Sequence, residues 1–541
     1  MRARGARTAL LGGACALLAV TCVSAAAQTS ARARPVARPV ALPAPSTMSA
    51  GPAGPTLPLG TAQPDPDGTV DTLQEALSRA YQTNPTLLAA RATLRATDET
   101  VPIDRADELP NASAQGTYTE YLLSSSSSAF SVSPARSAAG TLNLTVPLYA
   151  GGARHNTLRG AEIRDVAGRA DLRGTETSLF SQIVGAYMDV IQNEALVGLN
   201  QSNIDVLTVN LQATTDRFQI GDLTRTDVAQ SQSRLALARG DLRTAQANLI
   251  RAKENFLALV GSPPVDLKPP PPLPGLPATV DSALQVALGE NPDMAGALER
   301  ADAARYDVKT AAASRLPRVD LFASGAGTDY LGSLPVIPGF ASSNLQTSAQ
   351  AGVRATIPLY QGGKPAAQIR QAQARSSAAL EQVVLEERTL VSQVRGAYAS
   401  WQAANAIIAS SQTAVSAAQL SLEGVRAEST VGNRTILDIL NAQQELLQAQ
   451  VQLVTARRNA YVAGFTLLAA MGRAEARDLG LEAYGPLYDP VVNYKRVKDI
   501  AWDWEHDPAP VTQATRTVDI PPQDAEIPPD QRPAPVAPTV P

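Results

Sequence analysis

The sequence predicts a mainly α-helical protein with a small β part: a trimeric, 12-stranded membrane β-barrel continued by a 12-helix α-barrel, built from an internal duplication. Three observations predict this fold class. The chain of 541 residues contains one long unit twice. Each unit has two segments in which polar and apolar residues alternate, as in strands. The rest of each unit has the seven-residue periodicity of packed helices.

The chain begins with a predicted secretory signal peptide, residues 1–27. Arginines precede an apolar run that ends at Val23, and small residues follow it. Both cysteines of the chain, Cys15 and Cys22, lie in this segment, so the mature chain has no disulfide, thiolate metal site or cysteine nucleophile. After the signal, no apolar stretch reaches the roughly 18 to 20 residues of a membrane-spanning helix, so membrane insertion would require strands.

Proline-rich stretches mark the other boundaries, because they cannot bury a core. The predicted organisation is a signal peptide (1–27), a Pro/Ala-rich disordered extension (28–68), a first repeat (69–268), a Pro-rich linker (269–277), a second repeat (278–475), a C-terminal segment (476–506) and a Pro-rich disordered tail (507–541).

The duplication is visible in four short motifs that recur in the same order. They are NP at 84–85 and 291–292, VPLYAGG at 146–152 and IPLYQGG at 357–363, GAY at 185–187 and 396–398, and LVG at 259–261 and AMG at 470–472. The last three recur at a constant offset of 211 residues. A repeated unit of roughly 200 residues is much longer than a solenoid repeat.

Each repeat contains two predicted strands. The first strands start near Pro110 and Pro317, and the second strands end at the two PLY motifs. In the last of them, apolar Val353 and Ala355 alternate with polar Arg354, which is typical of a strand with one face on lipid and one on water. Each strand can extend over about 11 residues, enough to cross a bilayer at a tilt. The predicted loops between paired strands are 124–136 and 332–347.

Four strands cannot form a closed membrane barrel, because the smallest contain about 8. Open strand edges are not tolerated in lipid, so a symmetric assembly is required, and a trimer supplies 12 strands. Tyr149 and Tyr360 at the strand ends are expected at the membrane interface, with core packing as the alternative explanation.

The remaining segments of each repeat are predicted helices of roughly 24, 65 and 36 residues. The two shorter helices stacked end to end nearly equal the long one, so each repeat offers two helical columns. Pro102 interrupts the first short helix and predicts a local kink there. One heptad seam consists of Val228, Leu235, Leu242, Leu249 and Phe256.

The repeated motifs resemble the TolC-like outer-membrane efflux protein family. The resemblance covers roughly residues 70–475 and rests also on FQIG at 218–221, TDV at 226–228 and VGNRTILDIL at 431–440. It implies the outer-membrane channel of a tripartite efflux or type I secretion system in a Gram-negative bacterium, with its α-barrel in the periplasm. It implies a homotrimer in outer-membrane lipid, a periplasmic adaptor (membrane fusion) protein and an inner-membrane pump of RND or ABC type as partners, and passive conduction of substrates to the outside.

The resemblance also identifies the two periplasmic tips of the helical tube. They are the turns at Gly221 and Asp222 in the first repeat and at Gly432 and Asn433 in the second. These four residues are expected to contact the adaptor. Glycine is also favourable at a helix-ending turn for backbone reasons alone.

Three charged residues near the tips are the candidate gate. The resemblance implies that Asp227 and Arg434 form a charge pair that holds neighbouring helices closed. It implies that Asp438 forms an acidic ring on the threefold axis, which would favour cations. Asn441 stands where relatives can carry a second acid and Ser429 where they can carry an aromatic residue, so a single, weaker ring and a simpler lock are expected.

A structural role competes with this interpretation. Thr224 with Asp227, and Thr435 with Asp438, both have the spacing of a capping box, in which each side chain satisfies backbone donors of the first helical turn. An acid also lies favourably beside the positive end of a helix dipole. Capping and gating can coexist, and the sequence leaves both open.

Other chemistry is not supported by the sequence. A net charge of −4 provides no basic field for nucleic acid. His155 and His506 are too far apart in the chain to suggest a metal site, and the serine run at 124–128 has no accompanying histidine. We therefore expect no catalytic, cofactor or metal residues and no enzyme. The alternative function is a non-conducting periplasmic coiled-coil scaffold.

Overall fold

The computed structural model describes residues 70–122, 134–334 and 343–527. The predicted signal peptide, the extension at 28–68 and most of the two inter-strand loops lie outside these ranges. All described residues belong to one compact unit. Among them, no helix combines the length and the apolar character that crossing a membrane requires.

The two repeats follow one plan of short helices, two strands, one long helix and one returning helix. In the first repeat these are α1 (Leu73–Thr83), α2 (Pro85–Asp98), α3 (Thr100–Ala106), β1 (Asn111–Glu120), β2 (Arg136–Tyr149), α4 (Ala153–Gln219) and α5 (Arg225–Val260). In the second they are α6 (Val280–Glu290), α7 (Pro292–Ala313), β3 (Arg318–Asp329), β4 (Leu345–Thr356), α8 (Lys364–Thr430) and α9 (Ile436–Ala470). The 3₁₀ helix η1 (Leu481–Tyr484) and α10 (Pro490–Val497) follow. The long helices α4 and α8 both have 67 residues, close to the predicted length.

The first short helix is interrupted as predicted, whereas its counterpart α7 is continuous over 22 residues. Helix α2 ends at Asp98 and α3 begins at Thr100. Pro102 lies four residues after Asp98, and a proline ring clashes with the carbonyl four residues before it. The proline therefore accounts for the break.

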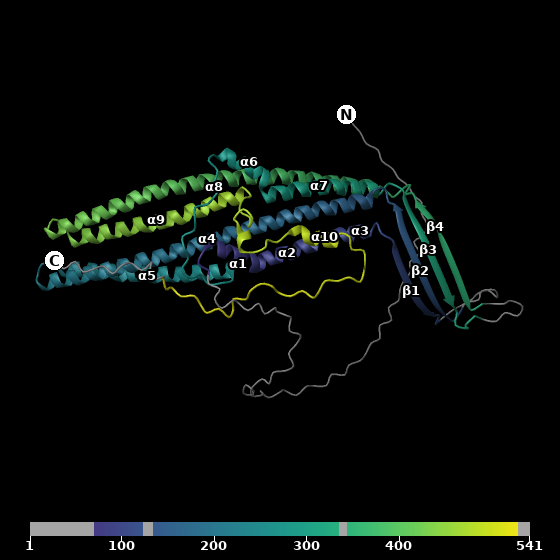
Figure 1. Ribbon diagram of the computed structural model, residues 1–541, viewed down its shortest axis with the longest axis horizontal. Coiled ribbons are helices and arrows are strands. Elements are labelled where there is room, and N and C mark those ends of the chain that lie inside the picture. Colours follow the sequence, from purple (N-terminus) through teal and green to yellow (C-terminus); the bar gives the residue numbers. More distant parts are fainter. Residues whose placement is uncertain (1–69, 123–133, 335–342, 528–541) are drawn as a thin grey trace, which may run out of the picture. The chain divides into compact units, whose positions relative to one another are not determined.

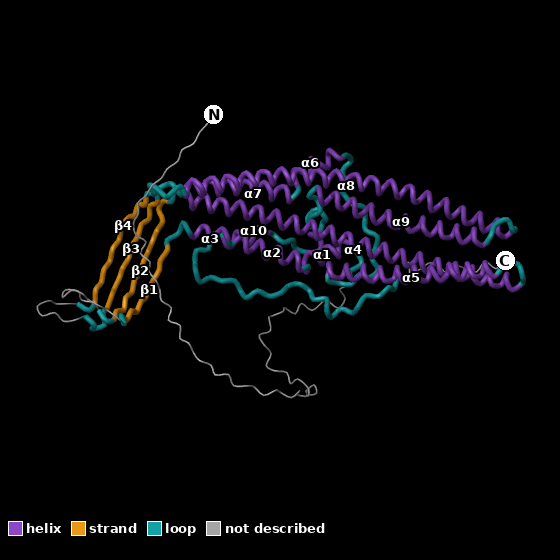
Figure 2. Tube along the Cα trace, turned by 180° about the vertical axis from the view of Figure 1, so that it is seen from behind, coloured by secondary structure: helices purple, strands orange, loops and turns teal. Residues whose placement is uncertain are grey.

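The four strands form one antiparallel sheet in the order β1-β2-β3-β4 (Figure 2). The first strand of each repeat, β1 or β3, starts where it was predicted, and β4 begins at Leu345, within the predicted loop. The β2–β3 pair joins the repeats, with Leu144 opposite Ala323. Strand β4 ends at Thr356, before its PLY motif, whereas β2 continues through its own to Tyr149. In the described part of the chain, β1 and β4 each pair along one side only. The sheet therefore has two open edges, and Leu142 and Val353 are exposed on it.

Contacts between the longer helices, together with α3, arrange them in four adjacent columns, which can be followed in Figure 1. Helix α4 contacts α2, α3 and α5 on one side and α7 and α9 on the other, and α8 contacts α7 and α9. The column order is thus α2/α3 with α5, then α4, then α7 with α9, then α8. Each column leads into one strand, and the columns follow the same order as the strands. The predicted stacking of the two shorter helices within each repeat is confirmed.

An asparagine joins the stacked helices in both composite columns. The Asn84 side chain accepts hydrogen bonds from the first N–H groups of α2 and donates through Nδ2 to the carbonyl of Leu259 at the end of α5 (2.7 Å). Asn291 does the same between α7 and the carbonyl of Ala470 at the end of α9 (3.1 Å). One side chain thereby satisfies both the N-terminus of one helix and the C-terminus of another. This is the structural role of the two NP motifs.

The GAY motifs attach the connecting segments to the long helices. Tyr187 is fully buried on α4, and its hydroxyl donates to the carbonyl of Lys268 (2.7 Å) just before the linker. Tyr398 on α8 donates in the same way to the carbonyl of Ala278 (2.9 Å) just after it. The two tyrosines therefore fix both ends of the Pro-rich linker.

The described part of the tail differs from the disordered tail predicted for 507–541. Residues 507–527 contain no helix or strand, as their proline content predicts, but they lie on the folded body. The Lys253 ammonium donates to the carbonyl of Glu526 (3.0 Å), and Glu254 accepts from the backbone of Gln523 (2.9 Å). Backbone hydrogen bonds to α5 side chains hold this segment, a contact that composition does not reveal. Residues 528–541 lie outside the described ranges.

We expect Gly472→Ala to destabilise the fold much more than Gly480→Ala. Both glycines have a positive φ (75° and 71°), so both variants incur the left-handed backbone penalty of about 1 kcal/mol. A Cβ on Gly472 would also lie 2.5 Å from the carbonyl oxygen of Glu290 and 2.9 Å from Cα of Asn291, whereas Gly480 has open space around it. Backbone atoms cannot move aside easily, so overpacking adds about 1–3 kcal/mol. Apparent melting temperatures in detergent test this, and equal temperatures for the two variants would contradict it.

Candidate functional site

The first tip is the turn between α4 and α5. Gly221 has a φ of 84°, which lets the chain reverse without strain. The N–H of Asp222 donates to the carbonyl of Arg217 (2.9 Å), and Nε of Arg217 donates to the Asp222 carboxylate (2.7 Å). Ile220 is exposed at this turn. Phe218, in the last turn of α4, is also exposed. The tip is thus a closed, charged turn that presents apolar side chains.

The second tip, between α8 and α9, has the same backbone with different charges. Gly432 has a φ of 83°, and the N–H of Asn433 donates to the carbonyl of Glu428 (3.0 Å). Nε of Arg434 donates to the Glu428 carboxylate (2.7 Å), and Val431 is exposed. This ion pair is exposed to solvent, so it contributes little to stability by itself.

Both predicted capping boxes are present. The Thr224 backbone N–H donates to the Asp227 carboxylate (2.9 Å), and the Asp227 N–H donates to the Thr224 hydroxyl (3.3 Å). Thr435 and Asp438 repeat this arrangement at 2.9 Å and 3.3 Å. Hydrogen bonds from these threonines lower the pKa of both aspartates below its usual value. Both acids are therefore fixed and ionised at neutral pH, which suits a cap and a charged ring equally.

The predicted pair between Asp227 and Arg434 is not formed within one described chain. Arg434 binds Glu428 instead, and this contact raises the pKa of its guanidinium. The Asp227 carboxylate is occupied by its own capping box. A pair between the two residues would have to form between different copies, and it stays a prediction.

Sequence reasoning missed Arg217 and Glu428. Aligned through the duplicated motifs, the repeats place Glu428 at the position of Arg217 and Asn433 at that of Asp222. In the first tip the basic residue, Arg217, is on the helix, and the acid, Asp222, is in the turn. In the second tip Glu428 is on the helix and Arg434 follows the turn, so the charge order is reversed. A search for charged positions that differ between the aligned repeats would have found both residues.

The two helical hairpins, α4–α5 and α8–α9, are joined above the tips within one chain. Arg234 of α5 donates through Nη2 to the Asn441 side-chain oxygen on α9 (3.0 Å). The Asn441 position, expected to weaken an acidic ring, therefore has a second role in holding α9 to α5. A small apolar cluster seals the same seam, formed by Leu207, Leu235, Ala238 and Leu440.

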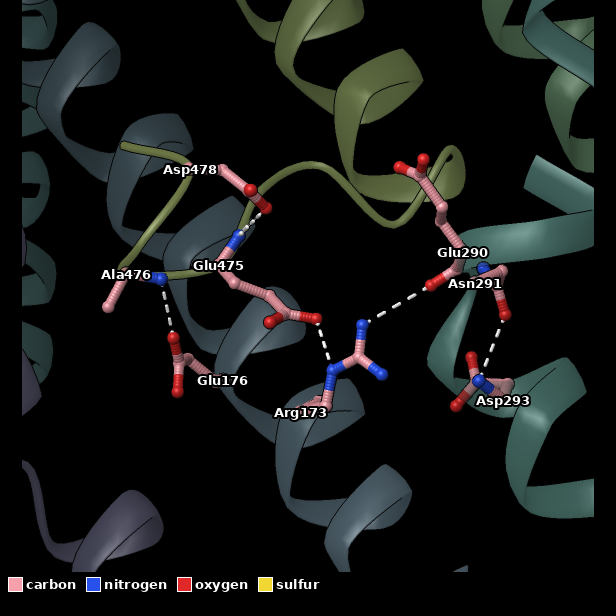
Figure 3. Close-up of polar contacts among 8 residues, drawn as sticks. All are labelled: Arg173, Glu176, Glu290, Asn291, Asp293, Glu475, Ala476 and Asp478. Carbon is pink, nitrogen blue, oxygen red and sulfur yellow. Dashed lines mark hydrogen bonds and ion pairs between the residues drawn. The ribbon is translucent and has the colours of Figure 1, made fainter. Parts of the chain in front are cut away.

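Farther from the tips, a polar cluster joins both repeats to the C-terminal segment (Figure 3). Arg173 of α4 lies between Glu475 and Glu290. It donates through Nε to the Glu475 carboxylate (2.6 Å) and through Nη2 to the carbonyl of Glu290 (3.4 Å). The neighbouring Glu176 carboxylate accepts from the backbone N–H of Ala476 (2.5 Å). We call these five residues the junction cluster. Its contacts hold α4 to the end of α6 and to the segment that follows α9, which indicates a structural joint.

Burial raises the pKa of Glu176 to about 7, and the negative charge of Glu475 acts in the same direction. Arg173 and the Ala476 N–H oppose this rise. The junction cluster thus contains a carboxyl that exchanges its proton near neutral pH.

A pair of buried carboxyl groups attaches α10. Asp98 at the end of α2 and Asp165 on α4 are both fully buried. Nδ2 of Asn493 on α10 donates to Asp98 (2.6 Å), while Arg169 pairs with Asp165 and lies 4.8 Å from the Tyr494 ring centre. Burial, followed by the contact with Asp98, raises the pKa of Asp165 to about 7. Helix α10 is therefore held by polar contacts to two columns.

No grouping suited to a resident metal ion occurs in the described ranges, because three or more His, Cys, Asp or Glu ligands never converge there. The candidate site therefore consists of the two tips, the Arg234–Asn441 contact and the junction cluster. Its chemistry is that of charge placement and helix fastening.

A family model described as outer membrane efflux protein matches residues 76–262 and 283–473. The outer membrane efflux protein BepC of Brucella suis is 33% identical over 433 residues, which cover 79% of this chain and 91% of BepC. The outer membrane protein TolC of Escherichia coli is 28% identical over 59% of this chain and 66% of TolC. The two matched stretches correspond to the two repeats and omit the linker between them.

Solved structures of outer membrane proteins have the same fold. The Vibrio cholerae protein VceC aligns with a TM-score of 0.63 at 24% identity, covering 74% of this chain and 96% of VceC. The Campylobacter jejuni CmeC outer membrane channel aligns with a TM-score of 0.66 at 18% identity, covering 79% of this chain and 89% of CmeC.

We expect Thr224→Ala and Thr435→Ala to loosen the tips. Each variant removes one side of a capping box and should lower the free energy of opening the first turn of α5 or α9 by about 1 kcal/mol. Hydrogen–deuterium exchange at those turns should accelerate severalfold. Thr413→Ala is the matched control, because the Thr413 hydroxyl donates only to the carbonyl of Ala409 on its own helix. Unchanged exchange at the tips would refute the capping role.

We expect Glu176 to make the fold less stable as the pH rises. The folded pKa is about 7 against an ordinary 4.5, so between these values the folded chain keeps a proton that the unfolded chain has lost. Stability contributed by this proton declines as the pH rises from about 4.5 to about 7 and remains lower above. Glu176→Gln should flatten this dependence, measured as melting temperature against pH.

Glu290 should show the opposite pH dependence. Arg473 lowers the pKa of Glu290 in the folded chain, so the stability that this carboxylate contributes is lost as the pH falls. Glu290→Gln should remove that contribution.

Proposed function

Because the chain belongs to the outer membrane efflux protein family, we propose that it is the outer-membrane channel of a tripartite efflux or type I secretion system. Members of this family are channel proteins of the Gram-negative outer membrane that act in efflux or secretion, and they are not enzymes. The proposal adds a passive conduction pathway from an inner-membrane pump to the outside.

One observation carries the proposal: four helical columns lead, in the same order, into four strands of a sheet with two open edges. Unpaired strand edges in lipid are very unfavourable, so they must pair with other copies. Three copies would close a 12-stranded sheet and continue it with a tube of 12 helical columns. The open edges therefore support a homotrimer surrounding a water-filled path.

The tips are the proposed periplasmic gate and the surface that meets the adaptor. Ile220 and Val431 are exposed at equivalent places in the two repeats, beside Gly221 and Gly432. Such paired apolar side chains suit a partner that contacts both tips of each copy. Opening requires the hairpins to separate, and the Arg234–Asn441 contact opposes this separation within each copy.

The pump, of RND or ABC type, supplies the energy and selects the substrate. This chain offers the conduit and its charge. In the proposed trimer the ionised Asp438 residues from three copies would face one another near the axis and favour cations. The capping box holds each carboxylate in place for this role.

We expect Asp438→Ala and Asp438→Asn to reduce cation preference without dissociating the trimer. Both variants remove the negative charge, while asparagine retains a side-chain oxygen for the cap. The reversal potential of single channels in planar bilayers under a salt gradient should move toward zero in both. Asp227→Asn, at the equivalent cap of the first tip, is the matched control.

An unchanged reversal potential would leave Asp438 with a capping role only. If the purified trimer inserts into bilayers without any conductance, the non-conducting scaffold becomes the better function.

A further inference from the structure

Two exposed tryptophans stand out on the surface of the C-terminal segment. Trp502 and Trp504 are 69% and 80% exposed, in a loop of residues 499–507 that we call the tryptophan loop. The third tryptophan of the chain, Trp401, packs edge-on against the Tyr398 ring at 5.9 Å. Two large indole rings left in water so close together indicate a surface that receives a partner.

The tryptophan loop is fastened at both ends. At its start, Nη1 of Arg105 donates to the carbonyl of Lys498 (2.7 Å), and the same guanidinium pairs with Asp499. At its end, the Arg496 guanidinium binds both carboxylate oxygens of Asp507 (2.8 and 2.9 Å). The loop is therefore presented at a fixed place on the body.

That place is where the first column passes into the sheet. Arg105 lies in the last turn of α3, and β1 begins a few residues later at Asn111. The start of β1 pairs with the end of β2, Asn111 opposite Thr145, so the loop is attached near the end of the sheet at which β2 and β4 terminate. Exposed apolar side chains at this end of the sheet are Leu148, Tyr149, Ile357, Leu359 and Tyr360. The tryptophan loop extends this apolar border onto the helical body.

The composition of the loop favours a lipid interface. Indole and phenol rings are enriched where acyl chains meet headgroups, because one part of each ring is apolar and another forms hydrogen bonds. The tryptophan loop itself carries four acids, Asp499, Asp503, Glu505 and Asp507, and three basic residues, Lys495, Arg496 and Lys498, directly precede it in the chain. Their charges nearly balance, so attraction to an anionic surface is not the driving force.

We propose that Trp502 and Trp504 insert into the periplasmic leaflet of the outer membrane and anchor the helical body to zwitterionic phospholipid at the base of the sheet. This inference rests on the proposed function, because that function puts the sheet in the membrane. Ile103, exposed on α3 two residues before Arg105, adds to the same apolar surface.

Tryptophan fluorescence of the full-length trimer in phosphatidylcholine vesicles tests the anchor. Lipids brominated near the headgroup end of their acyl chains should reduce the emission by roughly half, because two of the three tryptophans would lie at the interface. Trp502→Phe combined with Trp504→Phe should abolish this quenching. Trp401→Phe, the matched control, should preserve it.

Three results would overturn the anchor: no quenching by brominated lipid, equal quenching in the double variant, or quenching that requires anionic phosphatidylglycerol. Strong quenching by water-soluble acrylamide alone would also refute it. Conductance of the same preparation in planar bilayers is an independent measurement. A conducting trimer with unquenched tryptophans would reject the anchor and keep the channel, whereas failure to enter vesicles would reject both.

Discussion

The fold depends on joining helix ends without leaving backbone groups unsatisfied. A 67-residue helix needs neighbours of comparable length, and each neighbouring column is built from shorter helices placed end to end. At such a joint, donors of one helix and acceptors of the other would both lack partners. The amides of Asn84 and Asn291 satisfy both sides at once. The columns can therefore behave as continuous rods while the chain enters and leaves at their middle.

These two joints separate a firmly held body from helical hairpins that are held more weakly. The firmly held body contains the buried Tyr187, the junction cluster and the carboxyl pair that holds α10. Beyond them, toward the tips, the hairpins are held to each other by one small apolar cluster and a few polar contacts such as Arg234–Asn441. Motion confined to the hairpin ends is thus compatible with a stable body, because local opening is easiest where few apolar groups are buried.

Periodic and local features were predictable from the sequence, whereas contacts between distant segments were not. The duplication follows from motifs that recur in the same order, and the helix lengths, the break caused by Pro102 and both capping boxes follow from short-range patterns. The partner of Arg434 was missed because the expected pair came from a family resemblance, while Glu428 reaches it across the turn. The contact of residues 507–527 with α5 was missed because it is made by backbone groups of this segment. The Glu526 carbonyl accepts from Lys253 and the Gln523 N–H donates to Glu254, and neither depends on the side-chain pattern of the segment.

Matched column lengths also constrain how such a protein can change in size. Helices α4 and α8 have equal lengths, and α5 and α9 differ by a single residue. A heptad inserted into α4 alone would extend past its neighbours and shift the first tip away from the second. Lengthening the assembly requires the same insertion in all four hairpin helices together. Drift in length between homologues should therefore occur in whole, coordinated steps, and engineered chimaeras that exchange only one hairpin should misalign their ends.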